Sequence, residues 1–131
     1  YSNSYILNFV INNNLSKVIE NDIDIKTVIE YSDFDNLDYH TQLILFEYLI
    51  NLSITSCIQV TNSDRIIIIK SVKTANKIIL KILYSCLSIN ESNIKKNINE
   101  ILLNKYSSLS IKELNNSYAS ILISFDISGS F

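Results

Sequence analysis

Residues 54–72 read Ile54-Thr-Ser-Cys-Ile-Gln-Val60, then Thr61-Asn-Ser-Asp64, then Arg65-Ile-Ile-Ile-Ile-Lys-Ser-Val72, and this stretch decides the fold class of the chain. Two β-branched runs flank a short polar turn, which is the pattern of a β-hairpin, because isoleucine and valine favour strands. The same residues also fit a helix, so the stretch has two interpretations.

The helical interpretation rests on a capping signal and on a long apolar stripe. Thr61 and Asp64 have the spacing of a capping box, which begins helices. From Ile68 to Cys86 the apolar residues continue along one helical face without a break. We therefore prefer a helix here and keep a hairpin over residues 54–72 as the alternative.

Apolar residues recur at helical spacing in most of the remaining chain. Asp24 and the pair Asp35 and Asp38 are expected near helix starts, and Ser110 with Glu113 forms a second capping box. The stretches that we expect to be helical are residues 5–10, 15–19, 25–29, 37–52, 94–105 and 114–125.

These patterns predict an all-α fold, a compact bundle of about six or seven helices. We expect one domain over residues 1–126 and a flexible C-terminal tail over residues 127–131. One alternative is a short HEAT- or armadillo-like repeat fragment, because similar apolar segments recur at roughly 34 to 37 residues and residues 101–125 resemble one two-helix unit. A minority alternative is an α+β fold with a hairpin at residues 54–72.

The composition excludes several functional classes. Glycine, proline, alanine and arginine together supply only four of the 131 residues, so a glycine-rich phosphate loop and an arginine cluster are both missing. The formal net charge is −2 and the lysines are scattered, so we do not expect nucleic acid as a partner. The favoured residues have AT-rich codons, which indicates an AT-rich genome. We expect a soluble chain without a membrane span.

Little of the sequence points to catalysis. His40 is the only histidine, and Asp33, Asp35 and Asp38 precede it, so these groups could form an acid–base site. A surface histidine is the simpler interpretation.

Neither the two cysteines nor the other acidic residues require a catalytic or metal-binding role. Cys57 and Cys86 lie in apolar runs, which predicts buried free thiols and not a nucleophile. The acidic residues Glu20, Asp22, Asp24 and Glu30 lack the spacing of a calcium loop. We assign no catalytic, cofactor-binding or metal-binding residue.

The functional hypothesis is a non-enzymatic protein–protein interaction domain. It would bind a partner helix or peptide in an apolar groove lined by residues 66–69 or by the stripe at residues 43–52. Host-directed viral or bacterial inhibitors, including virulence and immune-modulating proteins, chaperones and scaffolds match this description, and a homodimer is one option. An intracellular location is favoured over secretion. The alternative function is a small hydrolase or transferase that uses His40 with the nearby carboxylates.

Overall fold

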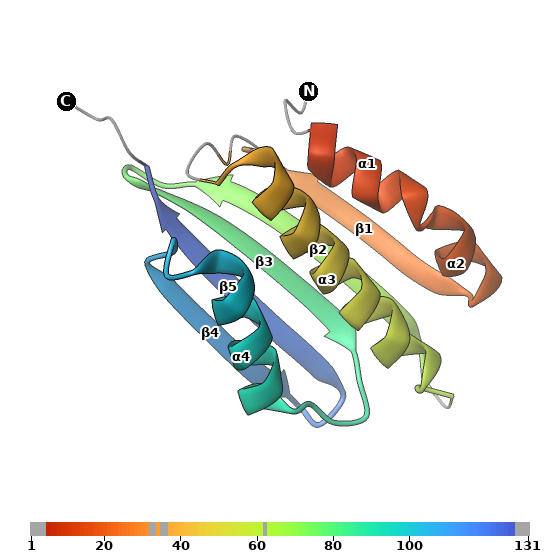
Figure 1. Cartoon of the computed structure of the whole chain (residues 1–131). Helices are drawn as coiled ribbons and strands as arrows, with labels where there is room; N and C mark the ends of the chain where they lie inside the picture. Colours follow the sequence, from red (N-terminus) through yellow and green to blue (C-terminus); the bar gives the residue numbers. More distant parts are fainter. Residues whose placement is uncertain (1–4, 32–33, 35–36, 62, 128–131) are drawn as a thin grey trace.

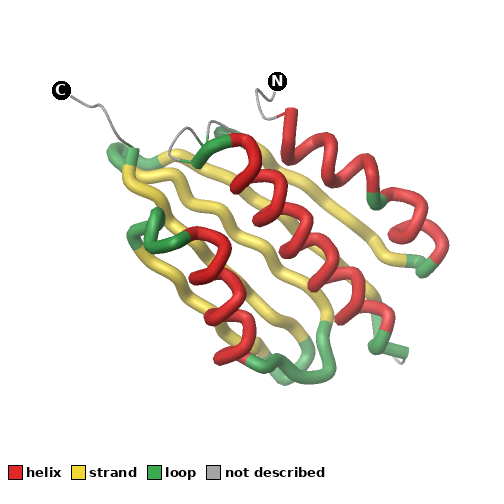
Figure 2. The backbone as a smooth tube through the Cα atoms, viewed as in Figure 1, coloured by secondary structure: helices red, strands yellow, loops and turns green. Residues whose placement is uncertain are grey.

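The computed structural model describes residues 5–31, 34, 37–61 and 63–127. These residues form a two-layer α+β domain in which one mixed sheet carries all the helices on a single face (Figures 1 and 2). The strand order across the sheet is β1-β2-β3-β5-β4. In chain order the elements are α1 (Tyr5–Asn13), α2 (Leu15–Glu20), β1 (Ile23–Ile29), α3 (Tyr39–Ile58), β2 (Arg65–Lys73), β3 (Lys77–Ser85), α4 (Glu91–Leu102), β4 (Ser108–Leu114) and β5 (Tyr118–Asp126).

The predicted all-α bundle is therefore wrong. The helix expected from Ile68 to Cys86 is instead the pair of strands β2 and β3. In β3 every second side chain, from Ile78 to Tyr84, is buried, which is the period of a strand with one face against a helical layer. The isoleucines of β2 and β3 thus follow the strand preference of β-branched residues.

The hairpin at residues 54–72 is also misplaced. Residues 54–58 complete helix α3, and β2 pairs antiparallel with β3, with Ile69 opposite Ile82. On its other side β2 pairs in parallel with β1, with Ile25 opposite Ile67. Helix α3 is the crossover that a parallel pair requires, so it lies across the middle of the sheet (Figure 1).

The C-terminal helix expected at residues 114–125 is a strand, so the HEAT-like unit at residues 101–125 does not exist. Ser110 and Glu113, which we interpreted as a capping box, lie in strand β4. The turn after β4 has Asn115 and Asn116 at φ 52° and 55°. Two left-handed residues in succession make a hairpin turn, and asparagine tolerates this conformation better than most residues.

Residues 25–29 are likewise not a helix but the end of strand β1, and Asp24 lies within that strand. The helices expected at residues 5–10, 15–19, 37–52 and 94–105 correspond to α1, α2, α3 and α4. Asp38 is the N-cap of α3, and its carboxylate accepts a hydrogen bond from the Thr41 amide at 2.7 Å.

The core lies between the sheet and the helices. Phe34, in the connection before α3, is buried and makes edge-to-face contacts with Phe46 of α3, at 5.4 Å between ring centroids, and with Phe125 near the end of β5, at 5.9 Å. Gln42 is buried beside them and donates hydrogen bonds from Nε2 to the carbonyl oxygens of Phe34 and Leu37. The segment before α3 is thereby fixed to the sheet.

Helix α3 is long and apolar enough to cross a membrane by length and composition alone, and part of it is buried inside the domain. The single domain over residues 1–126 remains a prediction. Of the predicted tail, Ile127 donates its amide hydrogen to the Asn76 carbonyl, and residues 128–131 lie outside the described part.

Candidate functional site

The outer side of helix α4 and the turn after it form an open hollow of about 550 Å³. Helix α4 buries Ile94, Ile98 and Leu102 against the rest of the domain, so its remaining faces are free to carry polar groups. The residues that line the hollow are Ser92, Lys95, Lys96, Asn99, Glu100, Leu103 and Asn104.

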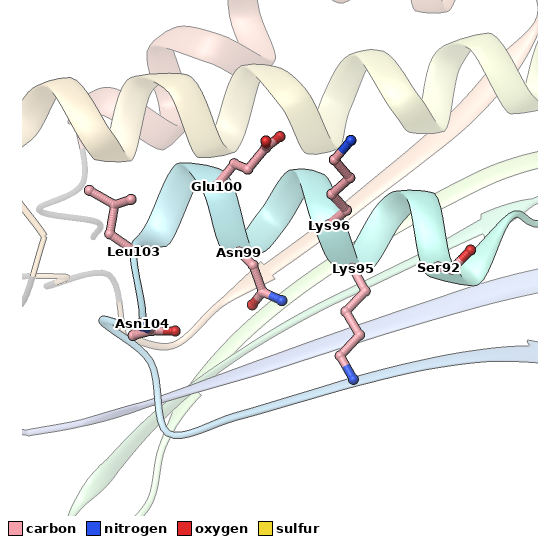
Figure 3. Close-up of a pocket in the computed structure, with 7 residues that line it drawn as sticks. All are labelled: Ser92, Lys95, Lys96, Asn99, Glu100, Leu103 and Asn104. Carbon is pink, nitrogen blue, oxygen red and sulfur yellow. The ribbon is translucent and has the colours of Figure 1, made fainter.

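The polar groups of this hollow point in two directions. Lys96 and Glu100 project from the side of α4 that faces α3, whereas Lys95 and Asn99 project from the opposite side (Figure 3). Both lysines are exposed. Ammonium and amide groups can bind an anion, but exposed charges are screened by salt, so such binding would be weak.

Two hydrogen bonds join polar side chains of helix α3 to neighbouring elements. Asn97 of α4 donates from Nδ2 to the Tyr48 hydroxyl at 3.2 Å. Further along α3, the Ser56 hydroxyl donates to the Ser85 carbonyl oxygen at 3.0 Å. The Ser85 hydroxyl itself donates to the Asp64 carbonyl and accepts from the Ile66 amide. The two serine hydroxyls hold α3, β2 and β3 together, and the Tyr48 hydroxyl joins α3 to α4.

Of the acid–base site considered around His40, the structure describes His40 and Asp38. His40 lies exposed in the first turn of α3. The Thr41 backbone hydrogen bond holds the pKa of Asp38 below its usual value, because the charged carboxylate accepts it. Asp33 and Asp35 lie outside the described residues.

The cysteines are buried free thiols, as predicted. Burial raises the pKa of Cys57 and of Cys86, so neither thiol is activated as a nucleophile. Glu20, Asp22, Asp24 and Glu30 are exposed around α2 and β1. Within the described residues, no three histidine, cysteine or acidic side chains lie together as a metal site.

Neither apolar segment that we proposed as a groove lining forms a groove. Ile67 and Ile69 are buried under the helices, while Ile66 and Ile68 are half-buried on the opposite face of the sheet. The stripe at residues 43–52 is mainly core, since Leu45, Phe46, Leu49 and Ile50 are buried, although Leu43 and Ile44 remain exposed.

Two arrangements were missed by sequence reasoning. Arg65 holds three carbonyl oxygens at the ends of α2 and α3. Lys70 of β2 and Lys81 of β3 are direct cross-strand partners. No sequence motif predicts either arrangement, because both depend on which strands are neighbours in the sheet.

No family model matches the sequence, and no curated protein matches it. Solved structures do match. The catalytic domain of the histidine kinase ThkA, in a nucleotide-free form, aligns with a TM-score of 0.71 and 14% identity over 92% of this chain and 89% of that chain. The histidine kinase AdeS of Acinetobacter baumannii aligns with a TM-score of 0.75 and 12% identity, over 95% of this chain and 64% of that chain.

The mycobacterial sensor histidine kinase MprB aligns with a TM-score of 0.64 and 9% identity, over 92% of this chain and 93% of that chain. At such identities the likeness shows the fold, which is that of histidine kinase catalytic domains. The prediction of a non-enzymatic helical interaction domain is wrong, because the similar structures are α+β domains of enzymes. A role in virulence or immune modulation has no support in these likenesses. The alternative of a small hydrolase or transferase that uses His40 stays a prediction.

Proposed function

We propose that this chain is the kinase-type domain of a protein that takes part in phosphoryl transfer with histidine. The observation that carries the proposal is the likeness to histidine kinase catalytic domains, which extends over 92% of the chain for ThkA and 95% for AdeS. The chain spans 64% of the AdeS structure, so in that protein a further part adjoins the matching region. We expect the domain to work within a larger phosphotransfer assembly.

The described residues do not fit a magnesium-bound nucleotide. Nucleotide phosphates are commonly held by backbone amides of glycine-rich loops, and the Mg²⁺ ion by carboxylates and phosphate oxygens. The only glycine of the chain, Gly129, lies outside the described part. Lys95 and Lys96, which line the hollow on α4, lie exposed, and within the described residues no cluster of acidic side chains could hold a metal ion. We therefore expect the phosphoryl donor to be another phosphoprotein.

The proposal is tested on the natural protein that contains this chain, isolated from its own cells. Phosphate bound to histidine is lost in acid and retained in alkali. We expect acid-labile phosphate on the protein or on a protein that purifies with it. Ile67 is completely buried in β2, so Ile67→Asp should unfold the domain and abolish the label, while the exposed Lys17→Gln should retain it. A protein that carries no acid-labile phosphate, or whose label survives Ile67→Asp, would overturn the proposal.

The nature of the donor is tested separately, by following backbone amide shifts while the chain is titrated with ATP and Mg²⁺. We expect no saturable change up to about 1 mM, which corresponds to a binding free energy of about −4 kcal/mol. Saturable, Mg²⁺-dependent binding below that concentration would show that the domain uses a nucleotide. The Lys95→Gln/Lys96→Gln variant would then show whether α4 holds its phosphates.

A further inference from the structure

The face of the sheet opposite the helices carries no other element within the described residues, since all four helices lie on one side (Figures 1 and 2). Strand alternation places on this open face the side chains whose neighbours in sequence are buried in the core. Half-buried apolar side chains on this face come from four adjacent strands, and they include Val28, Ile68, Val72, Ile79, Leu83 and Leu122. They form an apolar strip around the opposed pair Lys70 and Lys81, which lies between Val28 and Leu122 across the strands.

Lysines lie in the middle of this strip and on both sides of it. Lys70 and Lys81 are direct partners on β2 and β3, and like charges in directly opposite positions destabilise a sheet. Lys26 of β1 is the partner of Ile68, and Lys112 of β4 is the partner of Ser120. The lysines therefore reach from one edge strand to the other. The sheet therefore presents cations on four of its five strands.

Carboxylates do not balance these cations. Asp126 pairs with Lys77 at 3.0 Å at one corner of the face, and Asp24 is the remaining carboxylate among the strand residues of this face. Within the described residues no ion pair reaches Lys26, Lys70, Lys81 or Lys112. The imbalance is local, because the whole chain has a formal net charge of −2. A basic, apolar surface on an acidic chain is complementary to an acidic partner with apolar side chains.

We propose that the open face of the sheet binds an acidic amphipathic segment of a partner protein. Aliphatic side chains of that segment would lie on the strip around Ile68 and Leu83, and its carboxylates would pair with Lys70 and Lys81. Binding would remove the repulsion between the two lysines and shield the strip from water.

Size and charge distinguish this partner from a second copy of the chain. Strands lie about 4.8 Å apart and rise about 3.3 Å per residue, so the face offers on the order of 500 Å². A stable interface uses about 800 Å² on each partner, so the face suits a transient complex. In a symmetric dimer through this face the same patch would meet itself, which would bring Lys70 and Lys81 against their own copies. Like charges across an interface suppress such pairing.

The test uses a synthetic amphipathic peptide of leucine and glutamate, and the same peptide with glutamine in place of glutamate, titrated into the isotopically labelled chain. We expect the acidic peptide to shift the amides around Ile68, Ile79 and Leu122, with an affinity that falls as salt rises. Lys70→Gln/Lys81→Gln should weaken it about tenfold, as expected for the loss of two ion pairs. The matched variant Lys17→Gln/Lys105→Gln, at exposed lysines outside the sheet, should bind as the unchanged chain does.

A second measurement needs no ligand. Removing one charge of the opposed pair, as in Lys70→Gln, should raise the unfolding midpoint of the free chain, because the cross-strand repulsion disappears. The proposal is overturned if no amide shifts at millimolar peptide, if the glutamine peptide binds equally well, or if the shifts map to the helical side. It is also overturned if vesicles of phosphatidylcholine and phosphatidylserine retain the chain while the acidic peptide does not bind, because the ligand would then be an anionic membrane.

Discussion

Arg65, at the start of β2, donates a hydrogen bond from Nη1 to the carbonyl oxygen of Asn21, 2.7 Å away at the end of α2. The same guanidinium donates from Nε to the Val60 carbonyl at 2.8 Å and from Nη2 to the Ile58 carbonyl at 3.0 Å. The only arginine of the chain thus ties the end of α2 to the end of α3. Carbonyl groups at helix ends have no partner within the helix, and a cation there also interacts favourably with the helix dipole.

Replacing Arg65 by lysine should therefore destabilise the domain although the charge is kept. A lysine ammonium is a point charge and cannot reproduce the planar fork that reaches three carbonyl groups. We expect a loss of about 2 kcal/mol in the free energy of unfolding, measured by urea denaturation. Lys17→Gln on the exposed side of α2 is the control and should change stability by less than about 0.5 kcal/mol. An Arg65→Lys variant as stable as that control would show that these hydrogen bonds contribute little.

The helices could be predicted from the sequence because their determinants are local. Asp38 caps α3 three residues before Thr41, and α4 has an apolar face with polar residues elsewhere. The strands were misread for a physical reason. Lys77 and Lys81 are four residues apart in β3, and a spacing of four places side chains on one face of a helix and also on one face of a strand. Because isoleucine is so abundant, apolar residues also fit both the helical period of about 3.6 and the strand period of about 2, so the pattern could not separate the two.

The arrangement of the surface groups could not be predicted, because it depends on pairings between distant segments. Lys70 faces Lys81 only because the turn after Lys73 sets that register. Arg65 reaches Asn21 only because β1 and β2 are neighbours in the sheet. His40 and the cysteines could be judged from their surroundings in the sequence, and the structure places them on the surface and in the core as those surroundings suggested.

From the contacts of Phe34 with Phe46 and Phe125 we predict how strongly the segment before α3 contributes to stability. Phe34 is 2% exposed and contacts Phe46 and Phe125, so Phe34→Ala leaves a cavity between the sheet and α3. We expect the free energy of unfolding to fall by about 3 to 5 kcal/mol. This is a large part of the whole, because the free energy of unfolding of a domain is typically about 5 to 15 kcal/mol. Thermal and urea unfolding measure it. Phe9→Ala, at a side chain 59% exposed on α1, should be nearly neutral, and a similar loss in both variants would contradict this assignment.

Alkaline pH should destabilise the domain. Burial raises the pKa of Tyr84, Cys57 and Cys86 in the folded state, so the folded chain retains protons that the unfolded chain releases. The stabilisation is complete below the unfolded pKa values, about 8.5 for cysteine and 10 for tyrosine, and is lost as pH rises above them. Urea unfolding at a series of pH values should therefore show stability falling from about pH 8.5 upward.

The share of each group in this decline can be separated. Tyr84→Phe should flatten the decline above about pH 10, and Cys57→Ala should flatten it from about pH 8.5, each measured relative to its own value at neutral pH. Tyr106→Phe provides a comparison at a half-buried tyrosine outside the sheet. Stability that stays constant through this range, or a decline that Tyr84→Phe leaves unchanged, would show that these groups ionise without unfolding the domain.

Acidic pH should remove the stabilisation that the Asp38 cap gives to α3. The Thr41 amide lowers the pKa of Asp38 in the folded state, so this carboxylate stabilises the fold above its unfolded pKa, about 3.9, and the contribution disappears as pH falls through the folded value. Asp38→Asn keeps an oxygen that can accept the Thr41 hydrogen bond but cannot titrate. The variant should therefore lose less stability than the unchanged chain between neutral pH and about pH 3, measured by thermal unfolding. Asp38→Ala should be less stable than Asp38→Asn at neutral pH because it leaves the first turn of α3 uncapped. Equal stability of the two variants there would mean that the cap does not hold α3.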